Sequence, residues 1–300
     1  MKRKVIKQAN QAYTITLPID WVRKNKIDGK SELEVTESEK SLIITNKGDV
    51  ESKSAKIDAT DFQDRNIYRH ISALYAKGID EIEIKSNKDI SSGILRGLSN
   101  TIGYALLCKK DNVFQIKDIG GANYSDLDEI FKRVFQMILS FYDSAIKDVF
   151  GEQKETKSEL RVRDIEINKF CLFLQRAINK MSYHDSIKGR VLSTYSFEIE
   201  KIGDEITRFW ITNIDYKVKK TPEIKKLAEK SLKGLEMAFE FYYQFNSKKS
   251  EDLYSLRENV RLDSLKIKIA EPQTTRLIRH IVKIIEDAAD LTHLTLMIKL

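Results

Sequence analysis

Hydrophobic and polar residues alternate through the first fifty positions, whereas beyond about residue 125 hydrophobic residues recur every three or four positions. The alternation predicts short strands at RKVIKQ, TITL, ELEVTE and SLIIT. Pro18 interrupts it, and because the fixed φ of proline suits a first helical turn, we expect a short helix from there to Lys26. The predicted order is β-β-α-β-β in residues 1–50, too short a unit to bury a core alone. We therefore expect it to pair with a second copy.

The middle of the chain predicts a small α/β segment over residues 58–121. Residues 51–60 are polar and unpatterned, which indicates a linker. Helices are expected at RNIYRHISALYA, ending at Gly78, and at ISSGILRGLSNTIGYALL. Strands are expected at DEIEI and NVFQIKDI.

Everything after Ser125 has the helical period. We expect helices at about 125–149, 158–182, 186–218, 222–246, 250–270 and 273–299. Their starts are marked by capping residues or by proline, at Ser125, Thr156, Thr221-Pro222, Ser250 and Pro272. Short connections make neighbouring helices antiparallel, so the region predicts either two three-helix bundles, 125–219 and 222–300, or one continuous array.

Composition narrows the class of protein. Hydrophobic residues make up 41% of the chain, enough to supply cores, but no apolar stretch reaches the roughly 18 residues that a membrane helix needs. Cys108 and Cys171 have no metal-type or redox-type spacing, so both are expected to be small core residues in a reducing compartment. We expect a cytoplasmic protein without membrane insertion.

Basic charge is concentrated at the front of the chain. Of the net charge of +7, residues 1–30 contribute an excess of six, with eight bases against two acids. Lysines at the edges of small β units can serve solubility alone. Pairing of two copies, however, would double this charge and provide a surface for a DNA duplex. The residues that we expect to contact DNA are Arg3, Lys4, Lys7, Arg23 and Lys24.

The stretch YTITLPIDWVRKNKIDGKSELEVTESEKSLIIT resembles the SpoVT-AbrB swapped-hairpin module. The TLP-x-x-W core, the following helix, the Asp28-Gly29 turn and two strands carry the resemblance. It implies that two chains interlace their strands into one dimeric barrel, which usually binds DNA. This sequence departs from the family at Ala9-Asn10, where a glycine turn is common, and at Ile19, where a lysine is expected.

Two pairs of carboxylates lie four residues apart on the predicted helices. They are Glu200 with Asp204 and Glu286 with Asp290, 86 residues apart, which suggests an internal repeat. Each pair shares a helical face, where like charges cost about 0.2 to 0.5 kcal/mol unless a cation intervenes. A divalent or trivalent metal would use them as ligands, but a solvated helix face has the same pattern. His293 is either a third ligand or an exposed histidine.

The helices RVRDIEINKFCLFLQRAI, FEIEKIGDEITRFWI and RLIRHIVKIIEDAADL resemble the PhoU phosphate-regulator family. IYRHISALYAKGIDEIEI is similar to the middle of the archaeal-type fusions of an AbrB-like front to a PhoU-like back. The resemblance implies an α+β multidomain protein, with the β-rich module followed by the α/β segment and an all-α pair of three-helix bundles. It also implies Fe, Zn, Mn or Mg on the bundles. Asn168 stands where the family tends to have an acidic residue. The implied ligands are Asp164, Glu200, Asp204, Glu286 and Asp290.

These resemblances predict a homodimeric regulator of phosphate uptake and phosphate homeostasis that binds DNA and controls transcription. The alternative is an adaptor that contacts a phosphate transporter or a sensor kinase, with the front module serving only dimerisation. We do not expect an enzyme. A di-iron oxidase would need Glu-x-x-His pairs, to which Asp290-x-x-His293 is the nearest approach, and the chain has no glycine-rich phosphate loop.

Overall fold

The computed structural model describes residues 2–8, 12–38, 41–46, 52–110, 112–120, 127–151, 154–180, 186–216, 218–268 and 271–300. The chain forms two compact units, residues 1–51 and 52–300. Of the residues that the sequence singles out, Ala9, Asn10 and Ser125 lie outside the described residues. No helix in the described ranges is both long enough and apolar enough to cross a membrane.

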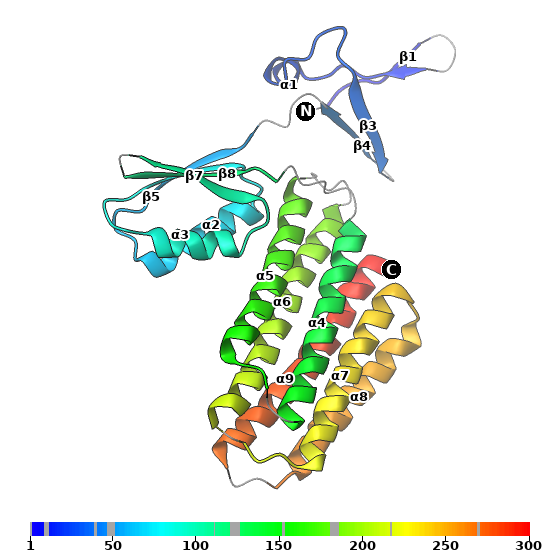
Figure 1. The fold of residues 1–300 in the computed structure, drawn as a ribbon. Helices are drawn as coiled ribbons and strands as arrows, with labels where there is room; N and C mark the ends of the chain where they lie inside the picture. The colour runs from blue at the N-terminus through cyan, green and yellow to red at the C-terminus, as the bar shows by residue number, and fades with distance from the viewer. Residues whose placement is uncertain are drawn as a thin grey trace. The chain divides into compact units, whose positions relative to one another are not determined.

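The first unit has the predicted β-β-α-β-β order (Figure 1). Strand β1 (Ile6–Lys7) pairs antiparallel with β2 (Tyr13–Thr14), and β3 (Leu33–Ser38) pairs antiparallel with β4 (Ser41–Asn46). Helix α1 (Ile19–Lys24) begins directly after Pro18, whose φ of −61° and ψ of 125° turn the extended chain into the helix. Asp28 Oδ1 then accepts hydrogen bonds from the Lys30 N–H at 3.0 Å and from the Ser31 hydroxyl at 2.8 Å, which closes the predicted turn.

This first unit buries none of its described side chains. Seven of its large apolar residues are half or more exposed, including Val35 at 58% and Leu42 at 64%. The others are Val5, Ile6, Tyr13, Ile15 and Ile19. Because apolar surface left in water forfeits about 25 cal/mol per Å² of burial, a single copy of this unit lacks a core.

The second unit begins with a four-stranded sheet of order β5-β6-β8-β7. The strands are β5 (Ser54–Asp58), β6 (Glu81–Lys85), β7 (Tyr104–Lys110) and β8 (Val113–Asp118). Strands β5 and β6 pair in parallel, whereas β8 pairs antiparallel with both β6 and β7. Helices α2 (Asp64–Ala76) and α3 (Ser91–Ser99) cover one face of this sheet (Figure 1). Isoleucines from the helices and strands form the core between them, among them Ile71, Ile82 and Ile94.

Three sequence predictions for this segment were wrong. The expected linker contains β5, in which Ala55 and Ile57 alternate with exposed polar residues and pack against the core. The helix predicted through TIGYALL ends at Ser99; Gly103 adopts a φ of 89°, and the chain continues as β7. Cys108 is exposed because it lies on β7 at the edge of the sheet, whereas Cys171 is buried as expected.

Six long helices follow in the described residues from 127 onward, as predicted. They are α4 (Leu127–Phe150), α5 (Lys157–Lys180), α6 (Ser186–Tyr216), α7 (Pro222–Tyr243), α8 (Ser247–Lys266) and α9 (Pro272–Lys299). The Thr156 N–H donates to Glu159 Oε2 at 2.7 Å, which caps α5 as the sequence indicates. The start predicted at Ser250 was wrong, because Asn246 accepts from the Lys248 N–H at 2.9 Å and begins α8 one turn earlier.

A single hydrophobic core includes residues of all six long helices. Helices α6 and α9 pack along each other, and the buried Tyr195 hydroxyl donates to the Leu291 carbonyl at 2.8 Å. The predicted apolar stripe of α9 is buried, including Leu277, Ile284 and Leu291. The α4–α6 and α7–α9 triplets therefore share one core.

Candidate functional site

The five residues predicted to contact DNA are all exposed. Arg3, Lys4 and Lys7 lie in and before β1, and Arg23 and Lys24 form the last turn of α1. Within the described parts of the chain, none of the five forms an ion pair. Basic residues in a last helical turn also stabilise the helix through its dipole, so this placement fits both DNA contact and a purely structural role.

The structure brings three of the five predicted metal ligands together and separates the other two. Asp164 of α5 and Glu200 and Asp204 of α6 line one cleft. On α9, Glu286 Oε1 lies 3.3 Å from Arg261 Nε, and Asp290 is exposed. In the described ranges no three His, Cys, Asp or Glu side chains are arranged to hold a metal ion.

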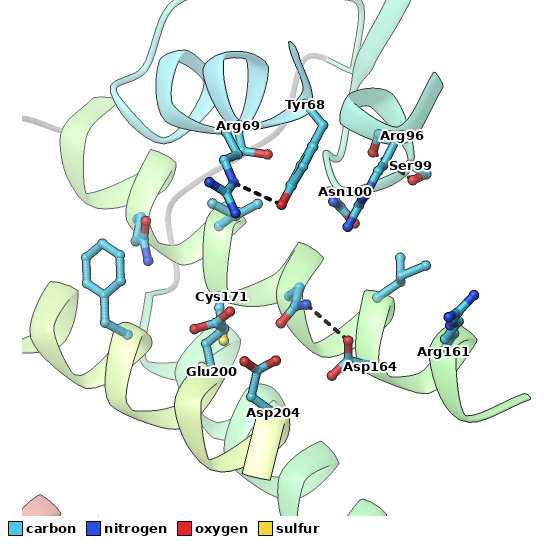
Figure 2. A pocket seen from close by; sticks show the side chains of 16 residues that line it. Tyr68, Arg69, Arg96, Ser99, Asn100, Arg161, Asp164, Cys171, Glu200 and Asp204 are labelled. Carbon is cyan, nitrogen blue, oxygen red and sulfur yellow. Dashed lines mark hydrogen bonds between the residues drawn. The ribbon is translucent and has the colours of Figure 1, made fainter. Parts of the chain in front are cut away.

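The cleft has a volume of about 870 Å³ and lies between two pairs of helices (Figure 2). Helices α2 and α3 form one wall, and α5 and α6 form the other. The first wall presents Tyr68, Arg69, Ser72, Arg96, Ser99 and Asn100. The second presents Arg161, Asp164, Ile165, Asn168, Cys171, Leu172, Gln175, Phe197, Glu200 and Asp204.

The carboxylates on the second wall differ in their hydrogen-bond and ion-pair partners. Asp164 Oδ1 accepts from the Thr207 hydroxyl at 3.0 Å, and Asp204 Oδ2 accepts from Arg208 Nη2 at 2.7 Å. Glu200 is half-buried and has no hydrogen-bond or ion-pair partner among the described residues. Burial, together with the charges of Asp204 and Asp164, raises the pKa of Glu200 to about 7.

The arginines of the cleft were missed by the sequence analysis. Arg69 Nε donates to the Tyr68 hydroxyl oxygen at 3.1 Å, and the Arg96 guanidinium lies 4.0 Å from the centre of the Tyr68 ring. Arg161 is exposed near the start of α5. In the part of the chain that the structure describes, none of these arginines forms an ion pair. The only signal in the sequence is that Arg69 and Arg96 lie off the apolar faces of short amphipathic helices.

A chain of charged groups leads from the cleft into the helical core. Arg208 donates to Asp204 and also to Glu205 Oε2, at 2.7 Å in both cases. Glu205 Oε1 lies 2.6 Å from Nδ1 of His280, which is fully buried on α9. Burial alone would raise the pKa of Glu205, but the hydrogen bonds from His280 and Arg208 lower it to about 2.

Comparison with known proteins assigns one part of the chain. Residues 6–52 match the family model described as antidote-toxin recognition MazE, bacterial antitoxin. No curated protein and no solved structure matches the chain. The match does not extend into the helical region. It identifies the N-terminal unit as a MazE-type, AbrB-like swapped-hairpin module, a kind of module typical of dimeric DNA-binding regulators.

Proposed function

We propose that this chain is a transcriptional regulator that binds DNA as a homodimer through its N-terminal module and acts in the cytoplasm. The single observation that carries the proposal is a basic unit that matches the MazE-type family model but buries no described side chain of its own. Such a unit needs a second surface to complete its core. The proposal includes no catalytic role.

Dimerisation supports DNA binding because it brings two sets of basic residues to one particle. Each chain contributes five exposed bases without ion-pair partners in the described ranges, at Arg3, Lys4, Lys7, Arg23 and Lys24. Neutralising DNA phosphates releases counterions, so binding of this kind weakens steeply as salt concentration rises. Phosphate contacts position a protein on DNA without reading its sequence.

The test is a titration of fluorescent genomic DNA fragments at several salt concentrations. The full chain is compared with the double variant Arg23→Gln, Lys24→Gln and with the control Lys225→Gln, Lys226→Gln, which removes the same charge from exposed positions on α7. Each lost phosphate contact should reduce the slope of log affinity against log salt by about 0.9. Equal slopes for the two double variants would contradict the assignment of these residues.

The finer proposal is that the protein regulates phosphate uptake and that its helical region is a PhoU-like sensor. The six helices, and the I-E-x-x-x-D motifs that two of them carry (α6 and α9), support it through the resemblance. Its test is to delete the gene for this chain and to compare transcription of phosphate-uptake genes in limiting and in excess phosphate. Unchanged expression of phosphate-uptake genes in limiting and excess phosphate would contradict this finer role and leave DNA binding as a separate question.

Metal ions, namely Fe, Zn, Mn or Mg, are part of the same resemblance. The described carboxylates do not fit a metal ion as they are arranged, because Asp204 is paired with Arg208 and no three of the described acidic, histidine or cysteine side chains are placed to hold one ion. Metal binding therefore stays a prediction. Elemental analysis of the purified protein tests it, with Glu200→Ala and Glu286→Ala as variants, and substoichiometric metal that neither variant changes would contradict it.

One observation favours a second candidate function. Arg23 and Lys24 stabilise the end of α1 whether or not DNA is present, so the N-terminal unit could serve dimerisation alone. The chain would then be an adaptor for a phosphate transporter or a sensor kinase. A dimer that binds no DNA at low salt would select this candidate.

A further inference from the structure

We infer that the cleft between α2 and α3 on one side and α5 and α6 on the other binds a small organic molecule that carries both an anionic group, such as a phosphate, and a protonated amine. The observation behind this inference is that Arg69 and Arg96 on one wall face the carboxylates on the other wall across the cleft (Figure 2). In the described ranges no ion pair joins the arginines to the carboxylates. Arg69, Arg96 and Glu200 also have no other ion-pair partner there.

The wall formed by α2 and α3, the arginine wall, suits an anion. Arg69 and Arg96 project from adjacent helices toward the cleft, and the Tyr68 ring and hydroxyl hold both side chains in place. Ser99 and Asn100 add hydroxyl and amide groups to the same wall. Planar guanidinium groups bind phosphate and carboxylate oxygens with paired, charge-assisted hydrogen bonds.

The carboxylate wall suits a cation. Glu200 has no hydrogen-bond or ion-pair partner among the described residues, and the carboxylates of Asp164 and Asp204 line the same cleft. A primary ammonium group has three donors, so it could bond to several of these oxygens and relieve their mutual repulsion. A simple anion would be repelled by these carboxylates, and a simple cation would be repelled by Arg69 and Arg96.

The space between the walls suits a molecule with a carbon framework. A volume of about 870 Å³ is far larger than an inorganic ion needs and lies within the range of small-molecule sites. Phe197 presents an apolar side chain that is 51% exposed, and Leu172 and Ile165 also line the cleft. These side chains can contact carbon atoms between the two charged groups of a ligand.

A ligand bound to both walls would hold α2 and α3 against α5 and α6. Its role as an effector of DNA binding rests on the proposed function, whereas the binding itself does not. Binding is therefore measured without DNA, and the effect of bound ligand on DNA affinity is measured separately. If the chain binds no DNA, ligand binding can still be measured. If the ligand leaves DNA affinity unchanged, the binding result still stands.

The experiment is calorimetric titration of the full chain with three matched probes. Glucosamine 6-phosphate carries both charges, glucose 6-phosphate lacks the amine, and glucosamine lacks the phosphate. We expect glucosamine 6-phosphate to bind at least about tenfold more tightly than either of the others, because each missing charge removes a charge-assisted contact. O-phosphoethanolamine is a second probe with both charges on a shorter framework.

Two variants assign the two walls. Glu200→Gln should abolish the preference over glucose 6-phosphate but keep the preference over glucosamine, and Arg96→Gln should do the reverse. The controls are Glu251→Gln and Arg279→Gln, which alter exposed residues of α8 and α9 outside the cleft. Both controls should bind like the unaltered chain.

Two outcomes would overturn the inference. One is that neither glucosamine 6-phosphate nor O-phosphoethanolamine binds. The other is that a probe binds but Glu200→Gln and Arg96→Gln leave its affinity the same as in the controls. Circular dichroism of each variant shows whether its helices are intact.

Discussion

Arg176 of α5 donates from Nη2 to Asp118 Oδ2 at 2.7 Å and so joins the helical region to the last residue of β8. The guanidinium is fully buried, and Nη2 also donates to Asp80 Oδ1 at 2.7 Å. Its Nη1 donates to the carbonyls of Tyr75 and Ile79. The rings of Tyr75 and Tyr104 flank the charged group. Because α5 also forms one wall of the cleft, this contact fixes the distance between the two walls.

We expect Arg176→Met to destabilise the second unit by about 3 to 5 kcal/mol, since it leaves the Asp118 carboxylate, whose side chain is only 12% exposed, without its charged partner. Asp80 would keep Lys180, whose ammonium also contacts it, but Asp118 would lose its arginine. The measurement is urea unfolding followed by far-ultraviolet circular dichroism. Arg279→Met, at an exposed position on α9, is the control. Equal midpoints for the two variants would show that the buried guanidinium contributes little.

The raised pKa of Glu200 predicts that stability falls as pH rises. The folded-state pKa is about 7 and the ordinary value is 4.5, so between these values the folded chain holds a proton that the unfolded chain has released. The destabilisation grows from about pH 4.5 to pH 7 and is constant above that. Glu200→Gln removes it and should stabilise the protein at pH 8 by an amount on the order of 1 to 3 kcal/mol.

Urea unfolding at pH 5 and pH 8 checks this prediction. The gain from Glu200→Gln should be much smaller at pH 5 than at pH 8, and Glu251→Gln, at an exposed position on α8, should show no gain at either pH. A gain that is the same at both pH values would mean that Glu200 is not the titrating group.

The opposite sign is expected for Glu205. Its pKa is lowered to about 2 by His280 and Arg208 in spite of its burial, so its stabilising contribution is present above pH 4.5 and is lost as pH falls toward 2. We expect Glu205→Gln to cost about 3 kcal/mol at pH 7, because it leaves the buried His280 ring without its charged partner. The measurement is again urea unfolding, with Glu251→Gln, at an exposed position on α8, as control. A variant as stable as that control would contradict the role of this pair.

The sequence predicted the long helices well because their signals are local. Thr156 with Glu159 and Thr221 with Pro222 mark helix starts through contacts within one turn. The apolar run IGYALL was misassigned because a short run fits either a helix or a strand. Its pairing with β8 decides the matter. The exposed apolar residues of the first unit agree with the expectation that two copies pair.

The cleft could be predicted only in part. The i, i+4 pattern located Glu200 and Asp204, and both line it. The arginines of α2 and α3 face these carboxylates because of contacts such as Arg176 to Asp80, which join residues 96 positions apart. No local pattern encodes a contact of that range.

Gly93→Ala should push α3 away from α2, on which it packs, and so disturb the wall of the cleft that these two helices form. A Cβ atom at Gly93 would lie 2.3 Å from the Asp64 carbonyl oxygen, which is backbone and cannot rotate away. Alanine favours an isolated helix by about 1 kcal/mol, but this clash should outweigh that gain and lower the thermal midpoint. Gly203→Ala is the matched comparison, because there the nearest atom is a side-chain methyl of Ile138 at 3.3 Å. If both alanines have the same effect, the close approach of α2 and α3 is not essential.

The exposed apolar face of the β3–β4 hairpin predicts where the chain dimerises. Val35 pairs with Ile44 and Glu37 pairs with Leu42, so Val35 and Leu42 lie on one face of the hairpin. Both side chains are more than half exposed in a single chain. In a dimer that completes the core they would be buried, and a carboxylate there would lose its hydration without gaining a partner.

Val35→Asp and Leu42→Asp should therefore convert the dimer into a monomer of 34.8 kDa, as measured by light scattering during size-exclusion chromatography. Leu265→Asp is the control, because Leu265 of α8 is 82% exposed and lies outside this hairpin. That variant should remain a dimer. Circular dichroism should show the long helices unchanged in all three variants, since α4 to α9 have their own core. A dimer that persists in Val35→Asp and Leu42→Asp would place the self-association surface elsewhere on the chain.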